Sequence, residues 1–373
     1  MRRPRILFSY LQPTSFVRDD LSLLAERYDV RSHEFGVDVA RGSLGKAAAL
    51  VRGMARLSAW TAAEAATADL LYGWFADYHI WPLVRQRRPI PLALAMGGYD
   101  AMDLPDLGYG VFASSWRGPL AKRVLGAADA LFPVSGSLVR SQNTFLRASG
   151  AEAQGVAVHV PRLQTKCTVV PTGYDPDAWP LGAIDRKPSV LSVATVDSHT
   201  TFLRKGLDVL IEVARAMPDV PFQVVGMRMD EAAVRERYHP PANVEFIRAL
   251  PREMLAAVYG QASVYLQLSR AEGMPNVLCE AMLCGCAPVG SNVFGIPDAI
   301  GDAGWIVDDP DPLAIAAAVR EALAAPEALR RRARAHIADT FPRERRRREL
   351  FGLLDALLDG ERPGVPACDW PLA

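Results

Sequence analysis

Two glutamates, Glu272 and Glu280, lie in the segment of this sequence with the most chemical potential, residues 269–297. Between them a turn with Gly and Pro leads to Asn276, a residue type that favours the start of a helix. A helix start presents free backbone N–H groups that bind phosphate. Glu280 would lie about one turn into this helix, where its carboxylate can accept two hydrogen bonds from a ribose diol. Glu272, in the turn, would lie nearer to a sugar carried by that phosphate.

Two glutamates at this spacing, taken alone, are most simply surface carboxylates. The neighbouring residues favour a site instead. Small residues, Ala281 and Gly285, crowd the end of the expected helix, and a further turn follows at Gly295 to Pro297.

Short apolar runs alternate with helical segments along the chain, which predicts α/β domains with mainly parallel sheets. The expected strands are 6–10, 28–33, 70–74, 91–96, 130–134, 189–193, 221–225, 243–247, 263–268 and 288–291. The expected helices are 19–25, 41–66, 206–216, 252–259, 276–284 and 312–324. Residues 169–180 contain three prolines and are expected to link two domains. Two such domains enclose a cleft, which is a common position for a ligand.

The composition is that of an ordinary globular protein. The 373 residues contain 42 Lys plus Arg and 42 Asp plus Glu, so the net charge gives no field that would favour nucleic acid. Five cysteines, an odd number in a long chain, suit a reducing compartment. The sequence contains neither a secretory signal nor an apolar run long enough for a spanning helix. We therefore expect a soluble, cytoplasmic protein.

The segment 269–297 resembles the donor-binding signature of family 4 retaining glycosyltransferases (glycosyl transferases group 1). Three further segments are similar to motifs of that family. They are residues 203–207 (LRKGL), residues 170–175 (VPTGYD) and Ser135 after an apolar strand. The match is specific over about residues 167–310 and weak before residue 120. It implies the GT-B fold, an α/β architecture of two Rossmann-like domains with parallel sheets that face across a cleft.

The resemblance implies roles for individual residues. Lys205 is expected to bind the donor diphosphate, Glu280 the ribose and Glu272 the hydroxyls of the sugar. Fixed cations such as Lys205 and Arg204 stabilise the negative charge that develops on a departing diphosphate. We expect both at a helix start, where the helix dipole strengthens the effect. Glu272, Lys205 and Arg204 are thus the predicted catalytic residues, acting with retention of the anomeric configuration.

Further donor contacts are expected around this centre. The predicted donor-binding residues beside Glu280 are Gly273, Met274, Pro275, Asn276, Gly226 and Arg248. Gly226 ends a strand, where the missing side chain would admit the nucleotide, although a simple turn glycine is equally compatible. Arg248 lies in the segment 246–249, where the resembled family reads the nucleobase. The donor is expected to be linked to UDP, GDP or ADP, with no cofactor.

The first domain departs from the family pattern at two places. Residues 11–15 (LQPTS) contain no glycine where many members have a glycine-rich loop, and the histidine of a His-Gly-x-Asp stretch is replaced in Gly97-Gly98-Tyr99-Asp100. Gly97, Gly98 and Asp100 remain candidates for the acceptor site, at even odds against a plain turn. His79, after an expected strand, is a weaker candidate, because a packed histidine is more common.

A metal site is not expected. Cys279, Cys284 and Cys286 lack the second ligand pair of a structural zinc site and suit small buried thiols. Asp309 and Asp311 resemble a metal-binding Asp-x-Asp motif, but their position before a helix suits a helix cap.

Two basic segments have a simple explanation. The stretch 39–60 contains Arg41, Lys46, Arg52 and Arg56 among apolar residues. An ordinary amphipathic helix is slightly favoured over a peripheral contact with an anionic membrane, which would suit a lipid-linked acceptor. The arginines of the last forty residues are expected to form a solvated helix face.

We therefore predict an acceptor-binding domain at 1–176 and a donor-binding domain at 177–340. Residues 341–373 should form a helix that packs toward the first domain, followed by a loose tail. The partners expected are a nucleotide-sugar donor and a sugar, a lipid-linked or a small-molecule acceptor, in bacterial glycan assembly. The alternatives are an epimerase or phosphorylase of the same fold, or a non-catalytic module that binds nucleotide sugars.

Overall fold

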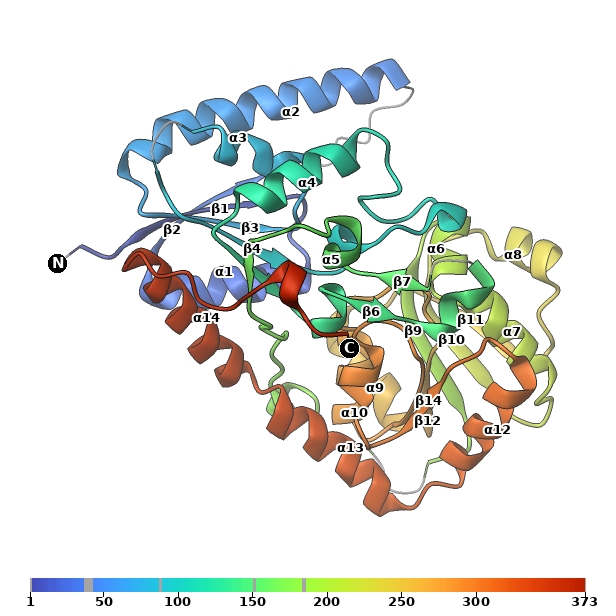
Figure 1. Cartoon of the computed structure of the whole chain (residues 1–373). Coiled ribbons are helices and arrows are strands. Elements are labelled where there is room, and N and C mark those ends of the chain that lie inside the picture. Colours follow the sequence, from blue (N-terminus) through green and yellow to red (C-terminus); the bar gives the residue numbers. More distant parts are fainter. Residues whose placement is uncertain (1, 37–42, 87–88, 150–151, 183–185, 373) are drawn as a thin grey trace.

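The computed structural model describes residues 2–36, 43–86, 89–149, 152–182 and 186–372. Within them, two sheets with their helices form two α/β units that lie side by side (Figure 1). The chain passes from the first unit to the second once near residue 175, and returns at the C-terminal helix α14 (Arg343–Leu358).

The first sheet has the order β15-β8-β5-β4-β3-β1-β2. Its strands are parallel except for the antiparallel edge strand β15. They are β1 (Arg5–Tyr10), β2 (Asp29–Glu34), β3 (Leu70–Trp74), β4 (Leu92–Met96), β5 (Ala130–Pro133), β8 (Lys166–Cys167) and β15 (Val365–Pro366). A small separate ladder pairs β6 (Ser141–Gln142) with β7 (Ala153–Gln154).

The second sheet has the order β11-β10-β9-β12-β13-β14, and every pair of neighbours is parallel. The strands are β9 (Val190–Val196), β10 (Phe222–Met227), β11 (Val244–Arg248), β12 (Val264–Gln267), β13 (Ala287–Ser291) and β14 (Trp305–Val307). The expected strands are confirmed, with ends that differ by at most three residues.

Helices cover both sheets. Those of the first unit are α1 (Ser15–Arg27), α2 (Ser43–Glu64), α3 (Trp81–Val84), α4 (Arg117–Ala127) and α5 (Val156–His159). Those of the second are α6 (His199–Arg204), α7 (Leu207–Arg215), α8 (Glu231–Tyr238), α9 (Arg252–Gln261), α10 (Asn276–Leu283), α11 (Ile296–Ile300), α12 (Pro312–Leu323) and α13 (Glu327–Thr340). Because helices shield both faces, central strands such as β3, β4 and β12 are buried at every residue, which explains their continuous apolar runs.

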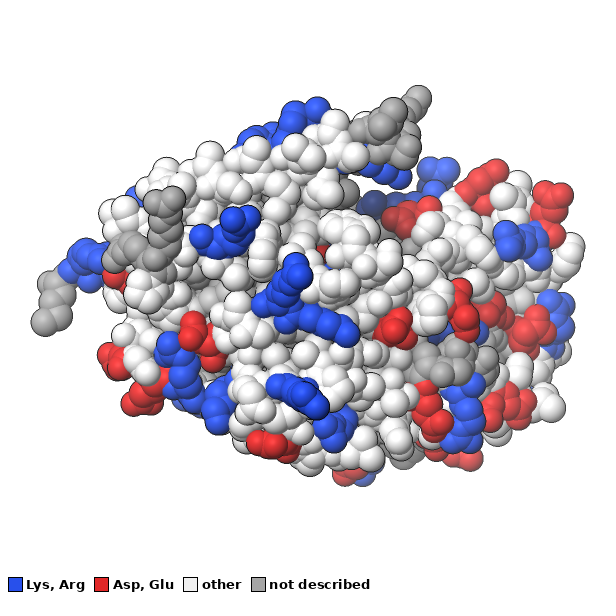
Figure 2. Space-filling view, turned by 45° about the horizontal axis from the view of Figure 1, so that its top comes forward, with Lys and Arg blue, Asp and Glu red and all other residues white. Residues whose placement is uncertain are grey.

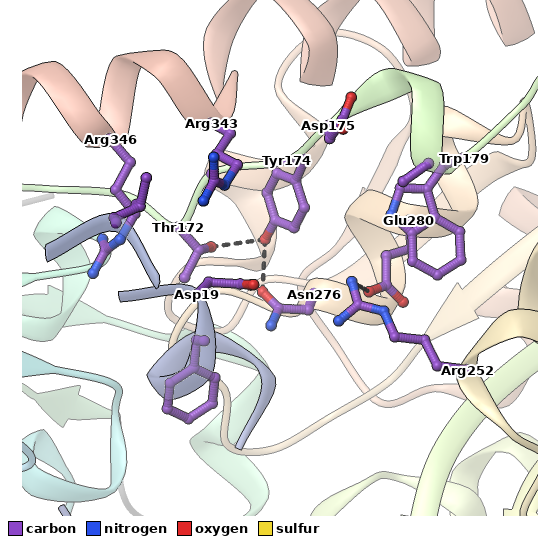
Figure 3. Close-up of a pocket in the computed structure, with 14 residues that line it drawn as sticks. Asp19, Thr172, Tyr174, Asp175, Trp179, Arg252, Asn276, Glu280, Arg343 and Arg346 are labelled. Carbon is purple, nitrogen blue, oxygen red and sulfur yellow. Dashed lines mark hydrogen bonds and ion pairs between the residues drawn. The ribbon is translucent and has the colours of Figure 1, made fainter. Parts of the chain in front are cut away.

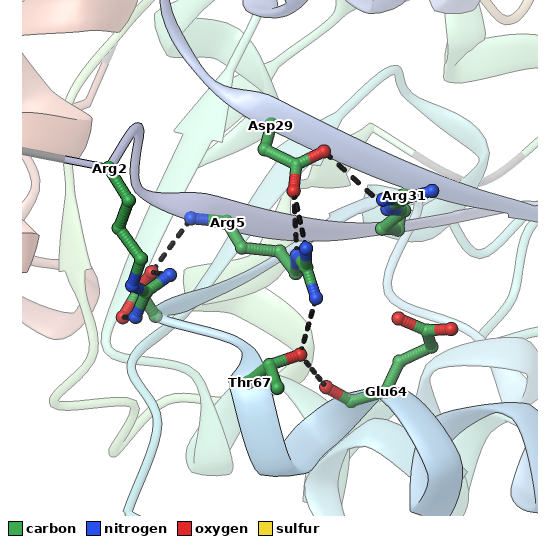
Figure 4. Close-up of polar contacts among 7 residues, drawn as sticks. Arg2, Arg5, Asp29, Arg31, Glu64 and Thr67 are labelled. Carbon is green, nitrogen blue, oxygen red and sulfur yellow. Dashed lines mark hydrogen bonds and ion pairs between the residues drawn. The ribbon is translucent and has the colours of Figure 1, made fainter.

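The amino end of the first sheet is held by polar contacts (Figure 4). The Arg5 guanidinium binds the carboxylate of Asp29 on β2 at 2.7 Å and the hydroxyl of Thr67 at 2.6 Å. The backbone N–H of Arg5 donates to Asp69, which also accepts two hydrogen bonds from Arg2. These contacts lie at the edge opposite to the carboxyl ends of the strands.

A buried ion pair joins the C-terminal helix to the first unit. Arg346 of α14 binds both carboxylate oxygens of Asp20 on α1, at 2.7 and 2.8 Å, and the side chains are 4% and 0% exposed. The same carboxylate accepts hydrogen bonds from Tyr72 and Trp74 of β3. The expectation of a solvated arginine face is therefore wrong for Arg346, whose charge is satisfied inside the protein.

The described residues after α14, up to residue 372, pack against the first unit, in contrast to the expected loose tail. Val365 and Pro366 pair with Cys167 and Lys166 as strand β15, and Ala367 is fully buried. The backbone N–H of Cys368 donates to Leu163.

Charges of both signs are interspersed over the face shown in Figure 2, in agreement with the balanced composition. Lys46, Arg52 and Arg56 of α2 are exposed, whereas Val39 and Arg41 of the basic stretch lie outside the described residues. Among the helices that the structure describes, none combines the length and the apolar content required to cross a membrane.

Replacement of Arg346 by Met should lower the free energy of unfolding by about 3–5 kcal/mol, because it leaves the Asp20 carboxylate buried without its counterion. The matched control is Arg347→Met. Arg347 pairs on the surface with Glu26 and Glu344, so its loss should lower the free energy of unfolding far less than the loss of Arg346. Urea unfolding followed by circular dichroism measures both. Equal losses in the two variants would contradict the role given to the buried pair.

Candidate active site

The carboxyl ends of the two sheets face each other. Ser135 follows β5 of the first sheet, and its hydroxyl donates at 2.5 Å to the carboxylate of Asp298 after β13 of the second. Nearby, the Asn143 side chain accepts at 2.7 Å from the backbone N–H of Phe294. Loops that leave parallel strands at such an edge are the usual place for a site in α/β proteins.

Lys205 and Glu272 form an ion pair at this edge. Lys205 lies beyond the carboxyl end of β9 and Glu272 beyond that of β12, and these strands are neighbours in the sheet. The Glu272 carboxylate also accepts from Ser269 at 2.9 Å and from Gln267 at 3.1 Å. Both side chains are largely buried, at 15% and 12% exposed.

The charges around this pair set its protonation. Burial would raise the pKa of Glu272, but the cations Lys205 and Arg204 hold it below the ordinary value. Burial lowers the pKa of the Lys205 ammonium, and Arg204 adds to this, while Glu272 opposes it. Glu272 is therefore a carboxylate at neutral pH, held ready as a hydrogen-bond acceptor.

Lys205 is not at a helix start, so the expected help from a helix N-terminus is corrected. Helix α6 ends at Arg204, Lys205 caps its C-terminus, and α7 begins two residues later. Gly206 separates the helices with a φ of 68°, and a Cβ there would collide with the carbonyl of Leu268. This contact brings Lys205 close to the loop that carries Glu272.

Glu280 lies in a different place, in a pocket of about 290 Å³ beside the link between the domains (Figure 3). Its carboxylate accepts from Arg252 at 3.2 Å and from the Tyr259 hydroxyl at 3.3 Å. The described residues that line this pocket include Asn276 but neither Lys205 nor Glu272. The predicted donor residues thus form two groups, joined by the turn from Gly273 to Asn276.

Asn276 fixes the start of α10 to the interdomain link. Its side-chain oxygen accepts at 2.8 Å from the hydroxyl of Tyr174, which is also bonded to Thr172 (Figure 3). The backbone of Tyr174 exchanges hydrogen bonds with Phe341 and Arg343, where the chain crosses back. The two interdomain crossings therefore lie side by side against the turn that carries the predicted donor residues.

Three glycines allow close backbone contact between the domains. A Cβ on Gly273 would collide with the carbonyl of Gly97, and a Cβ on Gly98 would lie 2.9 Å from the backbone nitrogen of Gly273. Gly98 has a φ of 117°, a backbone conformation that residues with a side chain rarely adopt. Gly295 packs on the other side, against the carbonyl of Gly273 and Ser135.

Arg204 adds a contact between the domains. Its guanidinium lies 4.7 Å from the ring centroid of Tyr109 in the first domain. A cation–π contact of this kind holds the guanidinium in place without neutralising its charge.

Residues 181–338 match the family model described as glycosyl transferases group 1. This match covers most of the second domain. D-inositol 3-phosphate glycosyltransferase of Segniliparus rotundus is 30% identical over 54% of this chain and 49% of that protein. D-inositol 3-phosphate glycosyltransferase of Mycolicibacterium smegmatis is 28% identical over 40% of this chain and 38% of that protein. The chain thus spans about half or less of these curated relatives.

Solved structures show the fold of the whole chain. Sucrose-phosphate synthase of Thermosynechococcus elongatus matches with a TM-score of 0.72 and 16% identity, over 96% of this chain and all of that one. Anabaena HepE in complex with UDP and glucose matches with a TM-score of 0.67 and 15% identity, over 95% of this chain and 100% of that one. The expected GT-B fold is confirmed.

Within the glycosyl transferases group 1 domain, the structure gives Gly226 a different role. Its φ is 108°, and a Cβ would collide with the carbonyl of Ala194 on β9, where the register of β10 shifts. Gly226 is therefore required by a bulge, and the space beside it is filled by a strand rather than open to a nucleotide. Arg248 is exposed at the carboxyl end of β11, Met274 is buried, and Pro275 precedes the first residue of α10.

The acceptor candidates of the first domain are corrected. His79 is fully buried and bonded through Nε2 to the carbonyl of Trp74, and burial lowers its pKa to about 4. Asp100 is also fully buried and accepts from the backbone N–H groups of Ala76 and Gly98. Beside Gly97 the space is filled by the ring of Phe75. The side chains of His79 and Asp100 are therefore not open to an acceptor, whereas an acceptor contact of the half-buried Gly97 stays a prediction.

The cysteines of the group 1 domain are separate buried thiols. Burial raises the pKa of Cys279 and Cys284 to about 12 and that of Cys286 to about 11. Asp311 caps α12 by accepting from two backbone N–H groups. In the part of the chain that is described, no cluster of His, Cys, Asp and Glu is arranged to hold a metal ion.

Sequence reasoning missed several polar residues of the Glu280 pocket. Asp19 of α1, Arg252 of α9 and Arg343 of α14 line it together with Trp179, although they are far apart in the sequence. Arg252 also lies 5.3 Å from the ring centroid of Trp179. Other lining residues did carry a signal, because Thr172, Gly173, Tyr174 and Asp175 lie in the linker motif of the resembled family.

The pH dependence of stability should report on Glu280. Burial raises its pKa from 4.5 to about 7, although Arg252 and Tyr259 oppose the change. Folding therefore takes up a proton, which favours the folded protein at acidic pH, and this contribution is lost as the pH rises from about 4.5 to about 7. Relative to Glu280→Gln, the wild type should lose stability on the order of 3 kcal/mol across that range.

Ligand-free unfolding of both proteins between pH 4 and pH 8 measures this difference. Asp100, whose pKa burial also raises, is common to both proteins and cancels. Asp19 interacts with Glu280 and raises its pKa, so its titration is part of the measured difference. A constant difference across the range would show that folding does not raise the pKa of Glu280.

Replacement of Gly273 by Ala should push the domains apart, because the new Cβ meets the first-domain backbone at Gly97. We expect a lower thermal midpoint and a larger radius of gyration by small-angle X-ray scattering. Gly352→Ala is the control, because its Cβ would meet open space on helix α14, where Ala is favoured by up to about 1 kcal/mol. An unchanged radius and midpoint in Gly273→Ala would contradict the close approach.

Proposed function

We propose that the protein is a retaining hexosyltransferase that moves a sugar from a nucleotide-sugar donor to an acceptor hydroxyl without a metal ion. The observation that carries the proposal is the Lys205–Glu272 pair, held at the facing carboxyl ends of two sheets in a group 1 domain. The nucleotide complexes of HepE support a nucleotide-bearing donor. The cytoplasm is the proposed compartment, with bacterial glycan assembly as the setting and the membrane contact of α2 as an open alternative.

The residues have distinct tasks in this proposal. Lys205 and Arg204 stabilise the charge that develops on the diphosphate as the bond to the sugar breaks. Glu272, an anion flanked by two cations, accepts hydrogen bonds from the sugar hydroxyls. Glu280 binds the ribose diol. To do so, its carboxyl group must give up the hydrogen bond from Arg252 and accept hydrogen bonds from the ribose hydroxyls instead. The acceptor hydroxyl attacks from the leaving-group face, and the departing phosphate takes its proton.

In the ligand-free protein the Lys205 charge is already neutralised by Glu272. The donor diphosphate must therefore compete for the ammonium, and Glu272 is then free to turn to the sugar. The binding of the phosphate and the positioning of the sugar are thus linked through one ion pair.

Nucleotide binding tests the donor site first. The wild type is heated with UDP, GDP or ADP, and one of them should raise the thermal midpoint. A ligand at a hundred times its dissociation constant stabilises by about 2.7 kcal/mol. Glu280→Gln should lose most of this shift. If none of the three nucleotides shifts the wild type, the donor assignment is wrong.

Turnover tests catalysis. Lys205→Ala should lower the rate of sugar transfer by about 10²–10³, the cost of removing one group that stabilises developing charge. Lys187→Ala, at an exposed position, is the control and should leave the rate unchanged. Nucleotide binding without transfer to any acceptor would favour the non-catalytic module, and conversion of the donor without an acceptor would favour an epimerase.

A further inference from the structure

Aromatic side chains gather at the carboxyl edge of the first sheet. Tyr78 follows β3, Tyr99 follows β4, and Trp116 directly precedes α4. Trp116 is 51% exposed, although a tryptophan buries a large apolar surface when it packs in a core. We call Tyr78, Tyr99, Trp116 and Arg117 the aromatic cluster.

Arg117 lies at the centre of the aromatic cluster. Its guanidinium is 5.1 Å from the ring centroid of Tyr78 and 4.8 Å from that of Tyr99. The rings of Tyr78 and Trp116 are 5.6 Å apart and inclined by 34°. The cluster is therefore a platform of aromatic faces around one cation.

The charge of Arg117 is neutralised by a buried carboxylate. Asp77, which is fully buried, accepts from Nε and Nη2 of Arg117, so the pair carries no net charge. Among the described residues, the remaining Nη1 of Arg117, the Tyr78 and Tyr99 hydroxyls and the Trp116 indole N–H have no hydrogen-bond partner. Apolar ring faces edged by hydrogen-bonding groups, with no net charge, suit a neutral polyhydroxylated ring. A phosphate would require a net positive charge. A lipid chain would make no use of these hydrogen-bond donors.

The aromatic cluster is connected to the reacting end of the site. The rings of Tyr99 and Tyr109 pack edge to face, with their centroids 5.2 Å apart, and the guanidinium of Arg204 lies over the Tyr109 ring. Tyr99 also directly follows Gly98, which touches the backbone of Gly273 next to Glu272. A ligand on the cluster would therefore lie on the first-domain side of the same cleft edge.

We propose that the aromatic cluster is a binding subsite for a neutral saccharide unit of the acceptor, with the sugar ring stacked on Trp116 and Tyr78 and its hydroxyls bonded to Arg117 and Tyr99. This inference rests on the proposed function, since it names the acceptor class of that enzyme. Trp116 is then a specificity-determining residue, not a catalytic one.

Saturation-transfer difference NMR tests the subsite with the methyl glycosides of glucose, mannose, galactose and N-acetylglucosamine, and with glucose 6-phosphate. We expect at least one neutral glycoside to bind the wild type. Trp116→Ala should weaken it by about tenfold, as expected for the loss of one aromatic contact. Trp116→Phe should retain most of the binding. Leu313→Ala, on a residue of α12 that is 71% exposed, is the control and should bind as the wild type does.

The thermal shift with nucleotide is measured on the same variants. Trp116→Ala should keep the wild-type shift, which shows that it is folded and that its donor site is intact. If wild type and variant both respond to nucleotide while the glycoside signals are absent, insensitive to Trp116→Ala, or weaker than those of glucose 6-phosphate, the saccharide subsite is overturned. If no nucleotide shifts the wild type but a Trp116-dependent glycoside signal persists, the proposed transferase fails and the saccharide site stands.

Discussion

The buried ion pair between Asp20 and Arg346 determines how the two domains are held. Its donors and acceptors come from four segments, namely α1, β3, the interdomain link at Val170 and Pro171, and α14. Two charges taken out of water are costly, and they are tolerated because each oxygen and nitrogen has a well-placed partner. The same link carries Tyr174, which bonds to Asn276 at the start of α10. The network therefore also positions the turn from Gly273 to Asn276.

The site itself depends on close backbone contact rather than on many side chains. Gly98, Gly273 and Gly295 allow the facing loops to touch, and Gly206 lets the segment with Lys205 approach the carbonyl of Leu268. Each is a position where a side chain would separate elements that must meet. Around them, Lys205, Arg204 and Glu272 place charge in a largely buried setting, where electrostatic interactions are stronger than in water.

Much of the fold was predictable, because continuous apolar runs mark strands that are buried on both faces, as in β4 and β12. The family motifs placed Glu272 and Lys205 in one site, and both do lie after neighbouring parallel strands, but their ion pair was not predicted. The direction of a single side chain in a loop was not predictable. His79 and Asp100 do follow strands, as expected, but their side chains turn into the core. Arg346 and Arg347 lie on different faces of α14, one buried and one at the surface. The local sequence, a run of arginines, does not indicate which of them is buried.

The edge strand β15 has a consequence for how the protein is made. The first sheet gains this strand, and Asp20 its counterion, from residues that come after the whole second domain. Multidomain chains generally fold during synthesis from the amino terminus onward. Here the amino-terminal domain cannot pair Asp20 until Arg346 has emerged from the ribosome, and it cannot complete its edge until Pro366 has emerged. The second domain, whose sheet is formed by residues 190–307, is the first to have all of its strands available.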